Sequence, residues 1–346
     1  MILAAGYGTR LRPLTDALPK PMVPVANRPL IGWAIEPLRN AGVRDLIINL
    51  HYLPESIERY VTNTFDANVR FSREPEILGS GGGVRNVRAW LESESDFFLT
   101  NADTLQFPRY DDLARARRER DAVAALTLRH PPKGDRYTPV WLSRCHPERS
   151  EGPGGGAARE GTESLSLPPR SLANARDDMA GIITGFGKGS GEPLIFAGAQ
   201  CASSRLFDYF PDRDVFGIVD DVYNPLVREG QETVAGVIDD NALWFDIGTT
   251  QRYLAACVAM LDATLRGDVA VVAGSRIDGD SIVAESARGR AVHSTIGARS
   301  VIEGDVRDSV VWDDCVIGAA ATLDRCIVAH GVEVRSGAFH EAILTG

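Results

Sequence analysis

The residues best suited to chemistry in this sequence lie close to its start. The apolar run Met1–Ala5 predicts a buried strand, and Gly6 and Gly8 follow it in a turn. Glycines lack a Cβ, so backbone N–H groups in such a turn can approach and cradle a chain of phosphates. Arg10 and Lys20 add cations that can neutralise charge on a transferring phosphoryl group.

Two acidic residues far apart in the sequence could bind a metal ion. Asp103 follows the apolar strand predicted at Phe97–Thr100, and a carboxylate at the carboxyl end of a strand faces the ligand crevice of an α/β fold. Asp246 lies in the segment Trp244–Thr249, before a predicted long helix. Mg2+ normally takes one or two protein carboxylates together with phosphate oxygens. Taken alone, Asp103 could cap a turn and Asp246 could be a helix-entry residue, so only the fold can unite them.

A second glycine-rich segment, Glu76–Val84, contains Gly81 and Gly82 at a predicted helix start. Glycines at this position suit a close approach to the base and ribose of a nucleotide. The alternative interpretation is a flexible loop. The first glycine turn is ambiguous in the same way, because a tight strand-to-helix turn with solvated Arg and Lys has the same pattern. An ordinary P-loop is disfavoured, since Thr9 and Arg10 follow Gly8 where Lys and Ser or Thr would stand.

The segment from Leu3 to Met22, LAAGYGTRLRPLTDALPKPM, closely resembles the signature of the sugar-1-phosphate nucleotidyltransferase family. The resemblance implies that Arg10 stabilises the transition state and the departing pyrophosphate, and that Lys20 contacts the α-phosphate region. The family usually has two or three more residues before this strand, which leaves a short first strand or a start upstream of Met1. The resemblance also implies a set of residues that wrap the NTP: Leu3, Ala4, Ala5, Gly6, Gly8 and Thr9.

The other segments match the same family with small departures. Asp103 corresponds to the Asp of an N-G-D pattern with Ala102 in place of Gly, and Asp246 to the Asp of W-x-D-x-G-T, so the resemblance implies a shared Mg2+. The segment with Gly81 and Gly82 resembles the family's base-side loop. Its sequence is intermediate between the guanylyltransferase and uridylyltransferase versions, so it does not indicate which base the nucleotide carries. On the sugar side the resemblance implies Gly198 at the sugar ring. Lys188 is a candidate for the sugar phosphate, although Gly187 replaces the usual Glu before it.

Alternating strand and helix signals predict an α/β fold with a Rossmann-like, mainly parallel sheet in residues 1–265. Residues 143–181 interrupt this pattern with Gly, Pro, Ser, Arg and Glu, and are predicted to be a disordered insertion. Residues 266–281 are expected to be a linker. In 282–346 short Ile and Val pairs recur about every six residues, which predicts a left-handed parallel β-helix of roughly three rungs.

Composition narrows the function classes. The chain has 346 residues, of which 44% are hydrophobic, and a formal charge of -10, which argues against nucleic acid or an anionic membrane as partner. The five cysteines are scattered and never form CxxC, as in a reduced, cytoplasmic protein. No apolar run approaches the roughly 20 residues needed to span a bilayer. We expect NTP and sugar 1-phosphate as ligands, and a homo-oligomer assembled through the β-helix is possible.

The function expected from the resemblance is transfer of a nucleotidyl group from an NTP to a sugar 1-phosphate, with Mg2+ as cofactor. The first expectation is a mannose-1-phosphate guanylyltransferase; the alternative is uridylyl or thymidylyl transfer to another hexose 1-phosphate. A non-catalytic regulatory subunit that binds nucleotide sugars should have lost Arg10, Lys20 or one aspartate, and this sequence retains all four. A second activity, acyl transfer by His293, His330 or His340 of the β-helix, is a further alternative.

Overall fold

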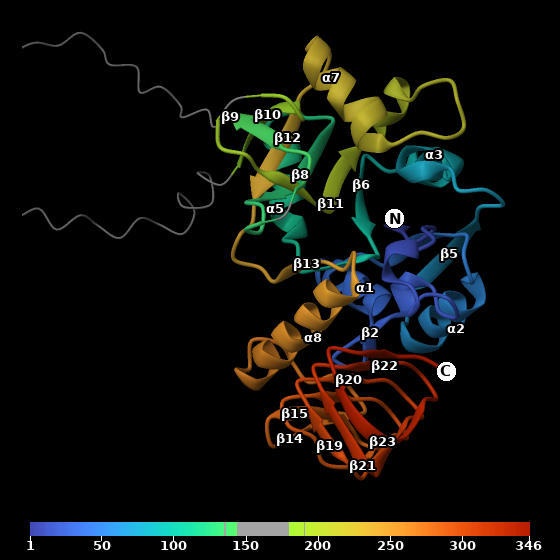
Figure 1. Cartoon of the computed structure of the whole chain (residues 1–346). Coiled ribbons are helices and arrows are strands. Elements are labelled where there is room, and N and C mark those ends of the chain that lie inside the picture. The colour runs from blue at the N-terminus through green and yellow to red at the C-terminus, as the bar shows by residue number, and fades with distance from the viewer. Residues whose placement is uncertain (135, 144–179, 190) are drawn as a thin grey trace, which may run out of the picture.

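The computed structural model describes residues 1–134, 136–143, 180–189 and 191–346 (Figure 1). Residues 144–179 lie outside the described residues, so the predicted disordered insertion stays a prediction. The described residues on either side of this gap belong to β9 (Val140–Ser143) and β10 (Ala180–Phe186). These two strands pair antiparallel, with Ser143 opposite Ile182. Among the described residues, none of the helices combines the length and apolar character that crossing a bilayer requires.

Within the described residues, nine strands form one sheet in the order β5-β4-β1-β6-β11-β8-β12-β10-β9. Only β10 and β11 run opposite to the other strands of this sheet, which confirms the predicted mainly parallel α/β fold. Besides β9 and β10, its strands are β1 (Ile2–Leu3), β4 (Asp45–Leu50), β5 (Asn68–Arg73), β6 (Asp96–Asn101), β8 (Ala124–Arg129), β11 (Ile195–Ser203) and β12 (Val234–Ile238).

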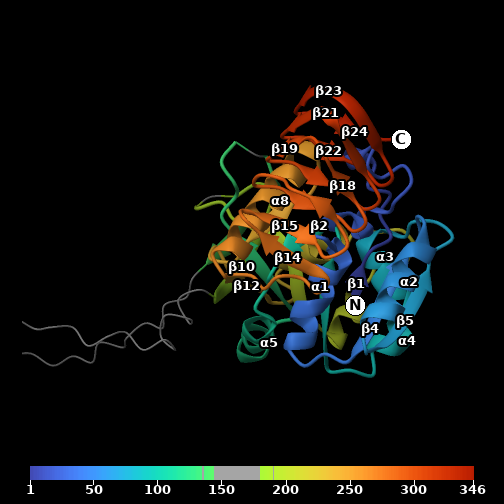
Figure 2. The same cartoon turned by 90° about the horizontal axis from the view of Figure 1, so that it is seen from below.

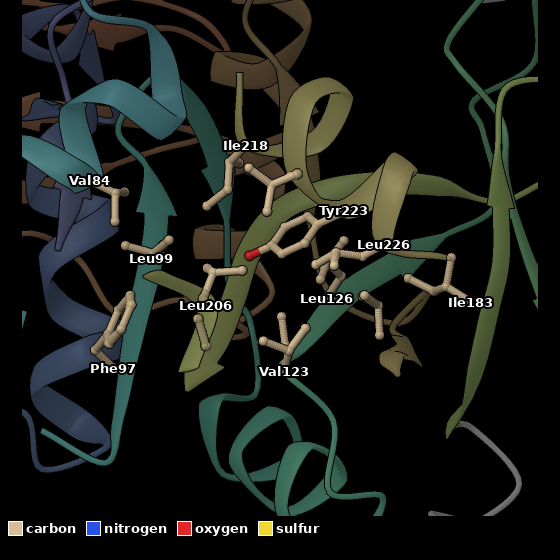
Figure 3. Packing of buried hydrophobic residues seen from close by; sticks show 14 of the residues in the cluster. Val84, Phe97, Leu99, Val123, Leu126, Ile183, Leu206, Ile218, Tyr223 and Leu226 are labelled. Atoms are coloured by element: carbon tan, nitrogen blue, oxygen red, sulfur yellow. The ribbon is translucent and has the colours of Figure 1, made fainter. Parts of the chain in front are cut away.

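Helices cover both faces of the sheet because side chains along each strand point alternately to opposite faces. On one face, core residues of the sheet pack against α3, α4 and α7; Figure 3 shows Leu99, Leu126 and Tyr223 in this core. On the other face, residues such as Ile2 and Ile48 pack against α1, α2 and α5. The helix bounds are α1 (Leu30–Asn40), α2 (Pro54–Thr64), α3 (Gly79–Asn86), α4 (Arg88–Leu91), α5 (Tyr110–Glu119) and α7 (Asn224–Glu229).

Strand β1 lies at the point where the order of the sheet reverses. The chain goes from β1 through α1 to β4 on one side, continues outward to β5, and then returns to β6 on the other side of β1. Leu3 pairs with Asn49 of β4 and with Asn101 of β6, so the carboxyl ends of the three strands lie next to one another. Ligands of open α/β sheets bind at such a switch point, outside the carboxyl ends of the strands.

A separate two-stranded sheet brings a distant segment to the same edge. Here β7 (Thr104–Gln106), which follows β6, pairs antiparallel with β13 (Trp244–Asp246). The register places Asp246 opposite Thr104. The long helix α8 (Thr250–Leu265) then leads away, and the Thr249 side chain caps its first turn by accepting a hydrogen bond from the Arg252 N–H.

The C-terminal region is a parallel β-helix, which confirms the predicted class of fold for the tail. Along one side, Ile282, Thr295, Val310, Ile327 and Ile343 stack in register. The intervals between these residues are shorter than the three six-residue repeats expected for a rung and differ from one another, so the sequence period is imperfect. One sheet contains β14 (Ser275–Asp278), β15 (Ser281–Ala284), β17 (Thr295–Ile296), β20 (Val310–Val311), β22 (Ile327–Val328) and β24 (Ile343–Leu344). The other contains β16 (Arg288–Gly289), β18 (Val301–Ile302), β19 (Asp305–Arg307), β21 (Val316–Asp324) and β23 (Glu333–His340).

Helix α8 joins the β-helix to the rest of the molecule (Figures 1 and 2). Buried Tyr253 and Met260 of α8 share one hydrophobic cluster with Val310 and Trp312 of the β-helix, and the Trp312 indole N–H donates to the Tyr253 hydroxyl over 2.9 Å. The cluster extends to Leu11 and Leu14, just after the first glycine turn. The β-helix thus supports the helix that begins directly after Asp246 and Gly248.

His293 makes a polar link between α8 and the β-helix. Its Nε2 lies 2.9 Å from Asp262 Oδ1 on α8, and its Nδ1 lies 2.6 Å from Asp308 Oδ1 on the β-helix. The backbone N–H of His293 donates to Asp280 Oδ1 over 2.8 Å. Hydrogen bonds to Asp262 and Asp308 raise the pKa of His293 above its usual value of 6.5, against the smaller opposing effect of burial.

We predict that His293→Gln lowers the free energy of unfolding by about 1 kcal/mol in acid and by little in alkali. Because the folded-state pKa is raised, this stabilisation is fully present below the unfolded-state pKa of 6.5 and is lost as pH rises through the higher folded value. Denaturant unfolding at about pH 5.5 and about pH 9 measures the difference. His340→Gln is the matched control, because exposed His340 pairs with Asp324, which also belongs to the β-helix, so this pair does not join the β-helix to α8. An effect of His293→Gln that is equal at both pH values contradicts the prediction.

Candidate active site

The first glycine turn follows directly from the short strand β1. Gly8 has a φ of +65°, a left-handed conformation that favours glycine, and a Cβ there would lie 2.8 Å from the Cβ of Lys20. The Thr15 hydroxyl donates to the Gly8 carbonyl over 2.9 Å and holds the turn from outside. A Cβ on Gly6, in contrast, would meet nothing within 4 Å. Gly8 is therefore required for packing against Lys20, whereas Gly6 borders open space.

Lys20 is buried beneath this turn and reaches the end of β6. Its side chain is only 5% exposed, and its Nζ lies 3.0 Å from Asp103 Oδ2. The carboxylate of Asp103 is 45% exposed, so one partner of this ion pair is dry and the other faces solvent. An isolated ammonium is costly to bury, and the pair with Asp103 offsets part of that cost. The pair joins two of the residues that the sequence singled out for chemistry.

Asp246 and Arg10 meet around Gly248. A Cβ on Gly248 would lie 2.9 Å from Arg10 Nη1 and 3.3 Å from Asp246 Oδ2, so the absence of a side chain makes room for both groups. Asp246 Oδ2 also accepts a hydrogen bond of 2.8 Å from Arg252 Nη1. Because Asp246 stands opposite Thr104 in the β7–β13 pair, it is held beside the residue that follows Asp103.

These residues surround one pocket of 160 Å3 at the carboxyl end of β1. Its volume suits a phosphate group rather than a whole nucleotide, since sites for entire small molecules span about 300–1,000 Å3. The lining is Leu3, Ala4, Gly6, Gly8, Thr9, Arg10, Leu11, Lys20, Pro21, Asp103 and Ile247. Ala5 is buried within the same turn, and Asp246 immediately precedes Ile247. The structure therefore brings the glycine turn, both cations and the segment of each aspartate together.

A much larger hollow of 1370 Å3 lies elsewhere, between α1, the start of α5 and residues 266–273. None of the residues predicted for the site lines it. Its lining mixes charges of both signs, such as Arg109 and Asp111, with aromatic rings such as Phe107. The smaller pocket is the candidate active site because the glycine turn, the buried ammonium of Lys20 and the carboxylate of Asp103 converge there.

The two aspartates fit a magnesium ion by donor type. Within the described ranges, no group of three or more His, Cys, Asp or Glu side chains is arranged to hold a metal ion. Asp103 and Asp246 offer hard carboxylate oxygens at the edge of a phosphate-sized pocket, and Mg2+ typically takes one or two such carboxylates and completes its shell with phosphate oxygens and water. Lys20 and Arg252 each contact the Oδ2 of one aspartate.

The second glycine segment packs against protein in this structure. Cβ atoms on Gly81 and Gly82 would lie 2.3 Å from the Phe216 ring and 2.2 Å from the Asp214 carbonyl oxygen. Both of their N–H groups donate to the Phe216 carbonyl, over 2.9 and 3.2 Å. Neither glycine is among the residues that line the pocket in the described chain. These two glycines therefore allow the segment 214–216 to pack closely against α3. The sequence pattern did not indicate this contact.

The two sugar-side candidates lie in different places. Gly198 has a φ of +105° in a bulge of β11, and a Cβ there would lie 3.2 Å from the side-chain nitrogens of Asn101 and Gln106. Because Asn101 ends β6, Gly198 is close to the edge that carries Asp103. Lys188 lies in the turn after β10, which packs around Trp141, and it is not among the pocket-lining residues. The structure thus places Gly198, but not Lys188, near the candidate site.

Two buried polar residues next to the pocket were not singled out from the sequence. Asn49 and Glu74 lie at the carboxyl ends of β4 and β5, with exposures of 3% and 4%. For Asn49 the available signal was a polar side chain near the end of the otherwise apolar strand β4, at the edge of the sheet where ligands bind, whereas Glu74 follows the mixed polar and apolar strand β5. Arg252, the partner of Asp246, was also missed; its place in the first turn of a helix gave no separate signal.

Residues 1–137 match the family model described as nucleotidyl transferase. A mannose-1-phosphate guanyltransferase of Gibberella zeae is 42% identical over 119 residues, which cover 33% of this chain and 33% of that protein. The corresponding Saccharomyces cerevisiae protein is 37% identical over 141 residues, covering 38% of this chain and 39% of its own length. A mannose-1-phosphate guanylyltransferase 1 of Arabidopsis thaliana is 25% identical over 352 residues, covering 100% of this chain and 85% of that protein. The chain thus matches well under half of the two fungal proteins.

Two solved structures share the fold. HddC from Yersinia pseudotuberculosis complexed with GMP-PN has a TM-score of 0.54 at 22% identity, over 75% of this chain and 97% of that one. A UDP-glucose pyrophosphorylase complexed with UDP-glucose has a TM-score of 0.56 at 16% identity, with the same coverage of 75% and 97%. Residues 1–137 thus match the nucleotidyl transferase family, the plant relative is similar over the whole chain, and the two solved structures share the fold.

Proposed function

We propose that this chain transfers a nucleotidyl group from an NTP to a sugar 1-phosphate and releases pyrophosphate. The observation that carries the proposal is the convergence of the glycine turn, Arg10, Lys20 and Asp103 in one phosphate-sized pocket, with Asp246 beside it. A cluster of this kind suits a reaction in which charge on phosphate oxygens must be neutralised. A purely structural turn does not require a buried lysine aimed at a half-exposed carboxylate.

The proposed reaction is an in-line displacement. A phosphate oxygen of the sugar 1-phosphate forms a bond to the α-phosphorus of the NTP, and the bond from that phosphorus to the bridging oxygen of pyrophosphate breaks. Lys20 neutralises charge at the α-phosphate, and Arg10 stabilises the departing pyrophosphate. Phosphoryl transfer of this kind depends on positioning and electrostatics, so no covalent nucleophile on the protein is needed.

Magnesium is the proposed cofactor, with Asp103 and Asp246 as its protein ligands. When bound, it would neutralise phosphate charge and orient the reacting groups. The pairing of Asp103 with Lys20 keeps that carboxylate at the pocket edge, and the β7–β13 pair holds Asp246 beside it. The donor set supports this assignment, since both residues offer hard oxygens.

For the substrates we propose GTP and mannose 1-phosphate first, on the names of the relatives, with UTP or dTTP and another hexose 1-phosphate as the alternative. A non-catalytic regulatory subunit is less well supported, because Arg10, Lys20 and both aspartates are present and grouped. The proposed setting is a reducing compartment, the cytoplasm: Cys201, Cys257, Cys315 and Cys326 are buried free thiols. Assembly of copies through the β-helix also stays a proposal.

We predict that Arg10→Ala and Asp103→Asn each lower turnover by a factor of about 10²–10³, because each removes a charge that acts on the reacting phosphates. The Arg10 side chain faces solvent, so Arg10→Ala should change the melting temperature little, whereas Asp103→Asn removes the charged partner of buried Lys20 and should lower it. Pyrophosphate release across four NTPs and a panel of hexose 1-phosphates measures this and selects the substrates. Arg12→Ala is the matched control, since Arg12 is exposed and pairs with Asp16 on the surface. Turnover equal to the wild type in Arg10→Ala and Asp103→Asn contradicts the proposal.

Lys20→Met is expected to abolish turnover without lowering the melting temperature. Methionine fills a similar volume and removes a buried ammonium, while Asp103, left without its partner, is 45% exposed and can be hydrated. Thermal unfolding and pyrophosphate release are measured on the same preparation. A large loss of stability together with retained activity would mean that Lys20 is a structural residue.

Removal of divalent cations with EDTA should stop pyrophosphate release, and added Mg2+ should restore it. The reason is that the two carboxylates and the triphosphate are all negatively charged, so a cation is needed between them. Asp246→Asn should raise the Mg2+ concentration needed for half-maximal rate. Full activity after exhaustive chelation would exclude the proposed metal role.

A further inference from the structure

Two buried polar side chains connect the walls of the candidate site. The Ala4 N–H, at the start of the glycine turn, donates to Asn49 Oδ1 over 2.8 Å. Asn49 Nδ2 donates to Glu74 Oε1 over 2.8 Å, and Glu74 Oε2 accepts from the Leu78 N–H over 3.1 Å. This chain runs from the turn that would hold the phosphates to the segment before α3. We call it the Asn49–Glu74 brace.

Each bond of the brace has a fixed direction. Both oxygens of Glu74 accept, and the amide of Asn49 accepts on one side and donates on the other. Ala4 directly follows β1 and Leu78 directly precedes α3, and the backbone N–H groups of both would otherwise need water or another acceptor. Because Ala4, Asn49 and Glu74 are buried, an exchange of donor for acceptor between the two side chains leaves two like groups facing each other without solvent.

The surroundings leave the brace little freedom to shift. A Cβ on Gly83 of α3 would lie 2.8 Å from both Asn49 Nδ2 and Glu74 Oε1, so α3 packs directly on the brace. A second link runs outside it: His51 Nδ1 lies 2.7 Å from the Glu74 carbonyl oxygen, and His51 Nε2 lies 2.9 Å from the hydroxyl of Tyr7, at the tip of the glycine turn. The start of the turn at Ala4 and its tip at Tyr7 are thus both linked to Glu74, the first through Asn49 and the second through His51.

We propose that Asn49 and Glu74 are positioning residues for the nucleotide. They fix the glycine turn relative to the segment Glu74–Gly79, so that the N–H groups of the turn are already oriented when the NTP binds. A preorganised site gains affinity because less ordering is required on binding. The inference rests on the proposed function, and it concerns NTP binding rather than the chemical step, because neither side chain lines the pocket.

The test is a swap of polarity within the brace. Glu74→Gln alone places an amide N–H₂ against either the Asn49 amide or the Leu78 N–H. Asn49→Asp alone places two carboxylates 2.8 Å apart, at the distance of the present hydrogen bond. In the double variant the new amide can donate to the new carboxylate, and an acceptor again faces the N–H groups of Ala4 and Leu78. The full set of hydrogen bonds is thereby restored with reversed polarity.

We expect each single variant to weaken NTP binding by about tenfold or more, and the double variant to recover most of that loss. Calorimetric titration with NTP and Mg2+, without sugar phosphate, measures the dissociation constant, and thermal unfolding is recorded for every variant. The KM for the sugar 1-phosphate should stay within about twofold, because the brace acts on the nucleotide side.

The same two strands offer a matched control at their opposite ends. Asn68 Nδ2 donates to Asp45 Oδ1 over 3.1 Å, in an exposed amide–carboxylate pair where β4 and β5 begin. Swapping this pair by Asp45→Asn with Asn68→Asp should leave NTP binding unchanged. A change as large as that of the brace variants would mean that any perturbation of the strands has this effect, and would overturn the inference.

Single variants that melt at a lower temperature but bind NTP as the wild type does would show that the brace only supports the fold. Failure of the double variant to recover binding would overturn the inference as well. Failure of the proposed function has a different signature: a wild-type chain that binds NTP but never releases pyrophosphate would refute the transfer activity, while the titrations would still decide the role of the brace. A wild-type chain that binds no NTP would refute both.

Discussion

The ion pair between Lys20 and Asp103 is the constraint on which the candidate site depends. The Lys20 ammonium is buried and the Asp103 carboxylate is partly exposed to solvent. The pair is therefore directed from the interior of the protein into the pocket. To form it, the segment after the glycine turn must fold back beneath Gly8, and β6 must end beside β1. The order of the sheet satisfies the second requirement, and the left-handed conformation of Gly8 satisfies the first. The pocket exists because these two conditions hold at one switch point.

The parts of the fold that the sequence predicted are those with strong local patterns. The helix α8 (Thr250–Leu265) confirms the long helix predicted after the segment Trp244–Thr249, and the Thr249 side chain caps its start. The alternation of strands and helices predicted the α/β class, and the Ile and Val pairs predicted the β-helix. The irregular intervals between rungs could not be predicted, because the residues of each turn depend on what packs beneath it, such as Tyr253 and Trp312.

For the site, sequence reasoning found the residues whose types are chemically distinctive and missed those that act through geometry. Arg10, Lys20 and Asp103 line one pocket, and Asp246 lies next to it; their catalytic and metal-binding roles stay predictions. Gly81 and Gly82 were interpreted as room for a base, yet their small size is used to pack against Phe216. A glycine indicates that another group approaches the backbone closely, and only the fold shows whether that group belongs to a ligand or to the protein. Asn49 and Glu74 were missed because their partners lie in distant segments, and no local pattern predicts such hydrogen bonds.

The pairing of β9 with β10 has an evolutionary consequence. Ser143 and Ile182 stand opposite each other on neighbouring strands, so any loop that joins β9 to β10 starts and ends at nearly one place. The entropy needed to close such a loop grows only slowly with its length. In the order of the sheet, β9 is the outermost strand and β1 lies toward the other end, far from this junction. Foreign sequence can therefore be acquired, lengthened or lost at this point over generations while the edge of the sheet at the candidate site keeps its shape.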